Sequence, residues 1–200
     1  MALDPAKARQ LYEAVINASD HDDVQAAADQ ALNFLMKQLE ELHVLANGYP
    51  RNWGTPAAVW IDGAALASWC DALTGAFSSK GLPREEELAS RLATGMAYQV
   101  MGHYPEQIFP RVLRNSRCRE AIDDLDGAIQ GYQAILSDFR VLGRDYLLED
   151  DEAPDKTDRT ILESVYEAAK RLGELKPEQA TALKDLQASI QRRLALYGSH

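Results

Sequence analysis

The chain has 200 residues, of which 46% are apolar, and it carries 21 Lys and Arg against 31 Asp and Glu. This apolar fraction is typical of a folded globular protein and excludes disorder over the whole length. The net charge of −10 disfavours general binding to nucleic acid or to anionic membranes, because both repel an acidic surface.

Four helices are predicted over the first hundred residues, at about 4–18, 23–46, 56–77 and 83–102. Aspartate-proline and threonine-proline pairs open the first and the third, which suits proline at the first helical position. The third is apolar on nearly all sides, so we expect it to be central and buried. The fourth has a predicted apolar stripe of Leu88, Leu92, Met96 and Val100.

The second hundred residues contain the longest apolar pattern of the chain. A short helix is expected at about 105–116, and an apolar repeat in steps of three and four then predicts one long helix over 117–148. An acidic stretch with a proline, at 149–155, is the best candidate for a domain boundary. Beyond it, two helices with a short connector are expected to form an antiparallel hairpin.

The sequence therefore predicts an all-α protein, a multi-helix bundle of about seven or eight helices. The bundle is predicted over residues 1–150, and the C-terminal hairpin over residues 157–197. We expect the hairpin either to pack back on the bundle or to pair with a second copy in a homodimer. No apolar run is long enough to span a bilayer, and the first residues lack a signal-peptide pattern.

The feature that most suggests function is a patch of arginines on this acidic chain. Within nine residues stand Arg111, Arg114, Arg117 and Arg119, with no acid among them. Guanidinium groups bind carboxylates and phosphates in a bidentate manner, so the patch predicts a site for an acidic partner or a phosphate-bearing ligand. The alternative is ion pairing with the protein's own acids, several of which follow directly at 120–126.

The position of the helix break decides how these arginines are grouped. If the helix continues through residues 115–116, Arg111, Arg114 and Arg117 share one face of it. If the helix ends there, Arg117 and Arg119 stand at the N-terminus of the next helix, where backbone N–H groups also favour an anion.

A second candidate site is the aromatic loop at residues 47–55, which contains Tyr49, Arg51 and Trp53. Aromatic side chains beside an arginine, on a loop between packed helices, suit recognition of a partner. His103 and Tyr104, at another helix break, would add to this surface if the loops meet. The alternative is that Tyr49 and Trp53 cover one end of the bundle as part of its core.

Signs of catalytic chemistry are absent from the sequence motifs. No phosphate-binding glycine loop, nucleophile elbow or zinc-binding pattern occurs, so we predict no cofactor and no metal. Cys118 lies between two arginines, which would lower the pKa of its thiol, but no base or oxyanion site is near it in sequence. We expect Cys118 to be a packed or merely exposed thiol, and Cys70 to belong to the core. Two cysteines so far apart indicate a reducing cytoplasm.

These observations favour a non-catalytic cytoplasmic interaction protein, such as an adaptor, an inhibitor, a regulator or a chaperone-like module. In this interpretation the arginine patch and the aromatic loop bind a protein partner. The alternative is a small-molecule-binding protein or enzyme, with a pocket at one end of the bundle near Trp53, Trp60, His103, Tyr104 and Arg111. A third hypothesis, local binding of nucleic acid by the arginines, is disfavoured by the net charge.

Overall fold

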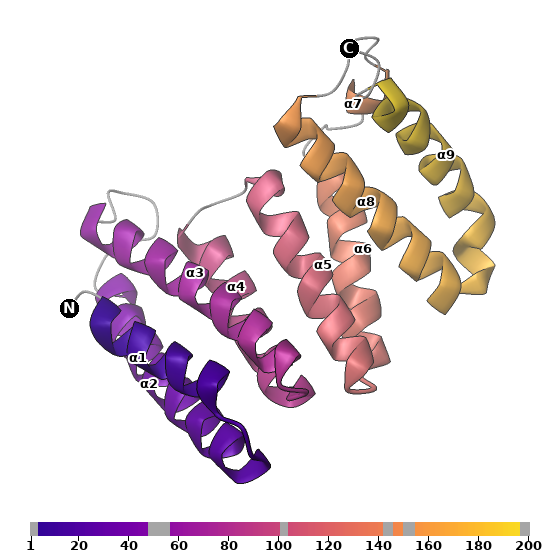
Figure 1. The fold of residues 1–200 in the computed structure, drawn as a ribbon. Coiled ribbons are helices and arrows are strands. Elements are labelled where there is room, and N and C mark those ends of the chain that lie inside the picture. The colour runs from indigo at the N-terminus through magenta and orange to yellow at the C-terminus, as the bar shows by residue number, and fades with distance from the viewer. Residues whose placement is uncertain (1–3, 48–56, 101–103, 142–145, 150–154, 197–200) are drawn as a thin grey trace. The chain divides into compact units, whose positions relative to one another are not determined.

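The structure, a computed structural model, describes residues 4–47, 57–100, 104–141, 146–149 and 155–196. All regular elements in these ranges are helices, which confirms the predicted all-α class (Figure 1). The chain divides into two compact units, Met1–Gly102 and His103–His200, and each is described by itself. The boundary predicted near residue 150 falls inside the second unit.

The first unit consists of two helical hairpins with a shared apolar core. Its helices are α1 (Pro5–Asn17), α2 (His21–Asn47), α3 (Ala57–Ser79) and α4 (Pro83–Val100). Asp4 caps α1 as predicted, because its Oδ1 accepts hydrogen bonds from the backbone N–H groups of Ala6 at 3.0 Å and Lys7 at 3.1 Å. Asp20 caps α2 in the same way, accepting from the N–H of Asp23 at 2.8 Å.

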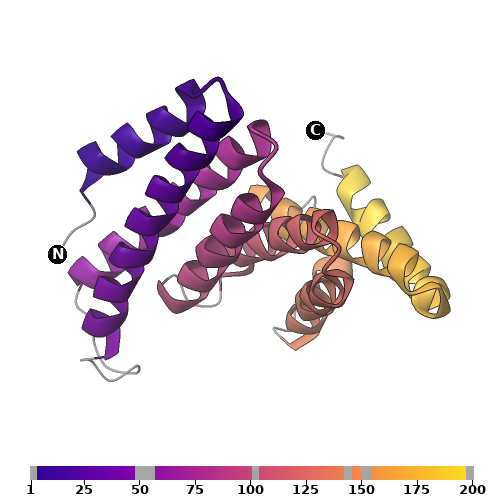
Figure 2. The ribbon, with the colours of Figure 1, turned by 90° about the horizontal axis from the view of Figure 1, so that it is seen from below.

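The third helix, α3, is the centre of this unit, and it contacts α1, α2 and α4 (Figures 1 and 2). Leu73 and Phe77 are fully buried, which confirms the prediction of a central helix. Trp69 packs edge-on against Phe34 with ring centroids 5.5 Å apart, and its indole N–H donates to the carbonyl of Ala8 at 3.2 Å. This one side chain therefore ties α3 to both helices of the first hairpin.

In the first turns of α4, the buried positions are shifted by one residue from the predicted apolar stripe. Leu88 and Leu92 are only partly buried, whereas Ala89, Ala93 and Ala97 are buried almost completely. Met96 lies on the buried side, as predicted. Alanine side chains let two helices approach closely, so the small residues face α3 and the leucines lie at the edge of the contact.

The second unit also consists of helical hairpins. Its elements are α5 (Pro105–Ala121), α6 (Leu125–Val141), α7 (Tyr146–Glu149), α8 (Lys156–Leu175), the 3₁₀ turn η1 (Pro177–Gln179) and α9 (Ala180–Leu196). The chain reverses between α8 and α9, and the Gln191 amide donates to the Tyr166 hydroxyl at 2.8 Å across the pair. The predicted C-terminal hairpin is thus present, and α8 packs back against α5 and α6 (Figure 1).

The predicted long helix over 117–148 is wrong, because the chain turns at residues 122–124. The N–H of Asp124 bonds to the carbonyl of Arg119 at 2.9 Å, and the N–H of Asp123 bonds to that of Glu120 at 3.1 Å. This is a Schellman motif, in which Asp123 adopts the left-handed conformation, with φ 64°. Asp124 then caps α6, because its Oδ1 accepts from the N–H of Gly127 at 3.0 Å.

The turn explains why the apolar repeat misleads. Leu125 belongs to the pattern but is 47% exposed, whereas Tyr132, Leu136 and Phe139 further along the pattern are buried. The two helices lie so close that a Cβ atom on Gly131 of α6 would overlap the Ser116 hydroxyl of α5. The predicted short helix at 105–116 likewise runs on to Ala121, because residues 115 and 116 are buried within α5 rather than forming a break.

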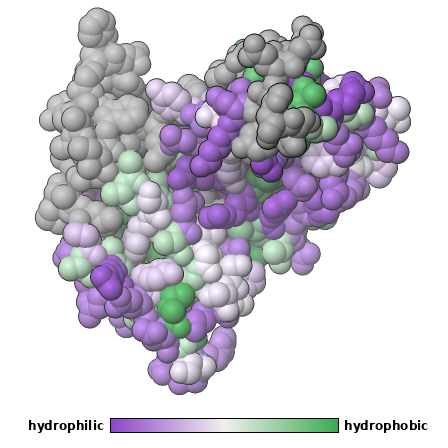
Figure 3. Space-filling view, turned by 45° about the horizontal axis from the view of Figure 1, so that its top comes forward, coloured by the Kyte–Doolittle hydropathy of each residue, from purple (hydrophilic) through white to green (hydrophobic). Residues whose placement is uncertain are grey.

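Within the described residues, no helix is long and apolar enough to cross a membrane. On the face drawn in Figure 3, hydrophilic residues predominate and strongly hydrophobic ones occur as separate spots. The large apolar side chains exposed among the described residues are scattered over several elements: Ile16, Met36, Tyr104, Leu125, Val141 and Leu196. Isolated positions of this kind are ordinary on protein surfaces and do not form a binding face.

Candidate functional site

Helix α5 carries all four arginines of the predicted patch. Because the helix continues through residues 115–116, Arg111, Arg114 and Arg117 follow one another at intervals of three residues along one side of it. Arg117 and Arg119 stand in the last part of α5, near its C-terminus. The alternative that placed them at a helix N-terminus is therefore wrong, since the backbone groups exposed near them are carbonyls rather than N–H groups.

Two of the arginines form ion pairs within the second unit. Arg117 Nη2 lies 2.9 Å from Glu167 Oε2 on α8, and both side chains are substantially exposed, at 53% and 32%. Arg119 Nε lies 3.8 Å from Asp124 Oδ2, beside the cap of α6. The acids at 120–126 thus supply one partner, as the ion-pairing alternative expects, and α8 supplies the other.

The remaining arginines also interact within the chain. Arg111 Nη1 donates to the backbone carbonyl of Gln107 at 2.9 Å, one turn earlier in α5. Arg111 and Arg114 each take part in a further interaction within the protein. The patch is therefore a set of cations that already have partners, and any ligand of these side chains has to exchange with those partners.

The other predicted site residues are distributed differently. Tyr49, Arg51, Trp53 and His103 lie outside the described residues. Tyr104 precedes the first turn of α5, where its side chain is 57% exposed and makes no capping hydrogen bond. Tyr104 is the N-cap residue of α5, with an extended backbone, and stands seven residues before Arg111.

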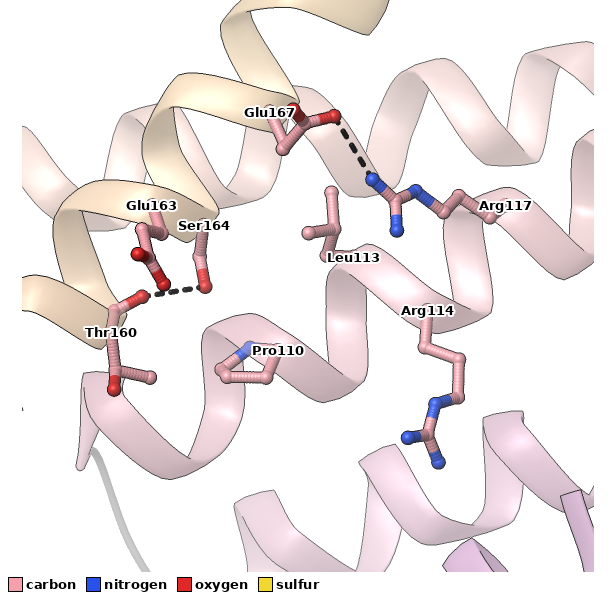
Figure 4. Close-up of a pocket in the computed structure, with 8 residues that line it drawn as sticks. All are labelled: Pro110, Leu113, Arg114, Arg117, Thr160, Glu163, Ser164 and Glu167. Atoms are coloured by element: carbon pink, nitrogen blue, oxygen red, sulfur yellow. Dashed lines mark hydrogen bonds and ion pairs between the residues drawn. The ribbon is translucent and has the colours of Figure 1, made fainter. Parts of the chain in front are cut away.

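A cleft opens between α5 and α8, with a volume of about 360 Å³. We call it the α5–α8 cleft. Figure 4 shows its lining residues, which are Pro110, Leu113, Arg114 and Arg117 from α5 and Thr160, Glu163, Ser164 and Glu167 from α8. Its volume lies at the small end of ligand pockets. Two of the four predicted arginines thus line this cleft, which sequence reasoning did not foresee.

The charges of the cleft are separated by helix. Both lining cations belong to α5, and both lining acids, Glu163 and Glu167, belong to α8. Pro110 and the buried Leu113 supply apolar surface between the two sides (Figure 4). The hydroxyls of Thr160 and Ser164 donate to carbonyls one turn earlier in their own helix, so toward a ligand they offer mainly lone pairs.

A second polar cluster, which sequence reasoning missed, joins three helices of this unit. Glu120 of α5 accepts hydrogen bonds from the hydroxyl of Tyr132 on α6 and from Arg171 on α8, whose Nε lies 3.3 Å from Glu120 Oε1 and whose Nη2 bonds to Oε2. Arg171 also pairs with Glu174 one turn further along α8. Tyr132 is fully buried. The tyrosine within the apolar pattern was the available signal, because a buried phenol requires a polar partner.

The surroundings shift the pKa values of this cluster in definite directions. Burial raises the pKa of the Glu120 carboxyl, but hydrogen bonds from Arg171 and Tyr132 and the charges of Arg171 and Arg117 outweigh burial, so the pKa lies below its usual value. Burial and the contact with Glu120 raise the pKa of Tyr132. The Glu120 hydrogen bond likewise raises the pKa of Arg171. The ground state is a carboxylate held by a guanidinium and a neutral phenol, which suits structure rather than proton transfer.

Three further residues with reactive or charged side chains are buried: two cysteines and one arginine of the last helix. Cys118 and Cys70 are both buried, so Cys118 is a packed thiol and Cys70 belongs to the core, as predicted. Arg193 of α9 is also buried, and its Nε donates to the carbonyl of Leu147 in α7 at 2.6 Å. Among the residues the structure describes, no three His, Cys, Asp or Glu side chains are grouped as metal ligands.

The chain was compared with known protein families, curated proteins and solved structures. No family model, curated protein or solved structure matches this chain. The cleft offers opposed rows of charge and an apolar floor, which are features of recognition. The Glu120 cluster offers fixed ionic contacts between helices, which are features of stability.

Proposed function

We propose that this protein is a non-catalytic, cytoplasmic interaction protein, an adaptor or regulator that binds a protein partner through the α5–α8 cleft and the adjoining arginines of α5. The observation that carries the proposal is that Arg114 and Arg117 line a cleft whose opposite side is acidic. Two buried thiols on an acidic chain support the cytoplasmic location.

The ion pair across the cleft is weak enough to be replaced by a partner. Both side chains of the Arg117–Glu167 pair are exposed to solvent. Exposed pairs of this kind contribute between 0 and about 1 kcal/mol to stability. A partner carboxylate that reaches Arg117, together with a partner cation that reaches Glu167, therefore forms two ion pairs in place of one at little cost.

The proposal is tested by affinity capture from the native host with the wild-type chain and with an Arg114→Glu/Arg117→Glu variant. A matched control, Arg140→Glu/Arg192→Glu, makes the same change of charge at exposed positions of α6 and α9. We expect at least one captured protein to be lost with the first variant and kept with the second. Capture that is the same with all three chains would contradict the proposal, as would the absence of any protein captured above background.

Dimerisation through residues 157–197 stays a separate prediction. The face of α8 that packs on α5 and α6 is already used within the unit, so this face is not available for a dimer contact of the hairpin. Sedimentation at several concentrations measures this directly.

A further inference from the structure

The charge pattern of the α5–α8 cleft restricts the kind of partner segment that can bind there. We infer that the cleft binds an amphipathic helix of a partner protein, with an apolar stripe that carries acidic residues along one flank and basic residues along the other. This inference rests on the proposed function, because it names the partner of the same cleft.

The spacing of the lining residues is that of one helical turn on both sides. Arg114 and Arg117 are three residues apart on α5, and Glu163 and Glu167 are four apart on α8. Residues three and four apart are neighbours along a helix surface, with Cβ atoms about 5–6 Å apart. A helix lying along the cleft presents side chains at this same interval, so one flank meets two cations while the other flank meets two acids. Glu163 also pairs with Arg159 one turn earlier in α8, at 2.7 Å, and because both side chains are about half exposed a partner cation can share or replace this pair as well.

The two sides of the cleft are aligned as well as spaced. Helices α5 and α8 run in the same direction here: Figure 4 shows Pro110 near Thr160 at one end and Arg117 paired with Glu167 at the other. One pair of charges, Arg117 and Glu167, therefore lies level across the cleft, and the other lining charges stand one turn earlier on each helix. A groove between two side-by-side helices is also the surface on which a third helix packs its ridge of side chains.

The residues at the bottom and at the edges of the cleft indicate which apolar and basic side chains the partner should carry. Pro110 and Leu113, three residues apart, provide an apolar floor that suits one or two aliphatic side chains. Arg114 extends away from α8 in Figure 4, so it forms the outer rim on the α5 side. The lone pairs of Thr160 and Ser164 add acceptors to the acidic side, which favours a partner that donates there through lysine or arginine.

The test uses two synthetic helical peptides of about 20 residues, a length at which isolated helices form. Both have the same composition and the same leucine stripe. In the first, glutamates occupy one flank and lysines the other; in the second, each flank carries both charges. A peptide with its flanks merely exchanged is no control, because a helix can enter the cleft in either direction.

Fluorescence anisotropy with the wild-type chain is expected to show binding of the first peptide about tenfold tighter than of the second, the effect of a few exposed charge pairs. The Arg114→Glu/Arg117→Glu variant should lose this preference. A fourfold variant, Arg114→Glu/Arg117→Glu/Glu163→Arg/Glu167→Arg, should regain it, because it separates the charges again in the opposite sense and the peptide enters reversed. All four positions are partly or fully exposed, so the exchange leaves the core intact.

Equal binding of the two peptides, or no binding of either, overturns the inference. If host proteins still depend on Arg114 and Arg117 in that case, the proposed function stands and only the chemistry of the partner is wrong. If wild-type chains associate with each other, lose this association in the double variant and bind neither peptide, the cleft belongs to a second copy, and the inference is likewise wrong.

Discussion

The two units of this protein hold their helices together through different kinds of interaction. The first centres on α3, whose buried side chains are apolar apart from Thr74, which bonds to the carbonyl of Cys70 in its own helix, and whose neighbour α4 approaches largely through alanines. The second adds an ionic cluster to its apolar core, in which Glu120 joins α5, α6 and α8 through Tyr132 and Arg171. Apolar packing is insensitive to pH, whereas a carboxylate cluster depends on its charge. The comparison therefore predicts distinct responses of the two units to mutation and to acid.

The largest effect is expected in the first unit, from Leu73→Ala. Leu73 is fully buried in α3, so its truncation should lower the free energy of unfolding by about 3–4 kcal/mol, with no dependence on pH. The three tryptophans all precede residue 103, so urea unfolding followed by tryptophan fluorescence reports on this unit. Met36→Ala, at a 43% exposed position, is the control and should cost under about 1 kcal/mol. Similar losses for both variants would show that α3 is not the centre of the core.

A smaller effect is expected in the second unit, from Glu120→Gln. Removal of the charge leaves Arg171 without its carboxylate, and because Arg171 is partly exposed the expected loss is about 2 kcal/mol at pH 7 rather than the full cost of a buried pair. Hydrogen exchange measured by mass spectrometry should place the loss of protection in α5, α6 and α8. Glu178→Gln, at an exposed position of η1, is the matched control.

The same variant gives a pH dependence with a definite sign. The pKa of Glu120 is lowered from its ordinary value of 4.5 on folding, so its contribution is fully present above about pH 4.5 and is lost as the pH falls through the folded pKa. The difference in stability between wild type and Glu120→Gln should therefore be constant at neutral pH and shrink in acid. A difference that is unchanged at pH 3 would show that the cluster contributes through packing rather than charge.

The smallest effect is a gain, from Asp123→Gly. Asp123 holds the left-handed position of the turn between α5 and α6, where glycine is free of strain. The change should raise the free energy of unfolding by about 0.5–1 kcal/mol. Asp126→Gly, three residues further along and inside α6, should instead lower it by about the same amount. Thermal unfolding followed by circular dichroism measures both, and equal signs would contradict the turn geometry.

The helical class, the capped start of α1 at Asp4, the buried α3 and the C-terminal hairpin were predictable from sequence, because caps, prolines and apolar periodicity are local signals. The turn at residues 122–124 was not, since it contains neither glycine nor proline and an aspartate takes the position that glycine usually marks. The repeat from Ile122 to Phe139 has the spacing of a single helix whether or not the chain turns, so periodicity alone misassigned it.

At the candidate site, too, some features of the arginine patch were predictable from the sequence and others required the tertiary structure. Its four residues and their excess of charge follow from the sequence, as does the shared side of α5 once the helix is known to continue. Only the tertiary structure brings Glu167 to Arg117 and Arg171 to Glu120, because these partners are about fifty residues apart and no local pattern links them. Sequence determines which segments form helices and where charge is concentrated, since both depend on near neighbours. The packing of α8 on α5 decides which charges meet, and with them the cleft.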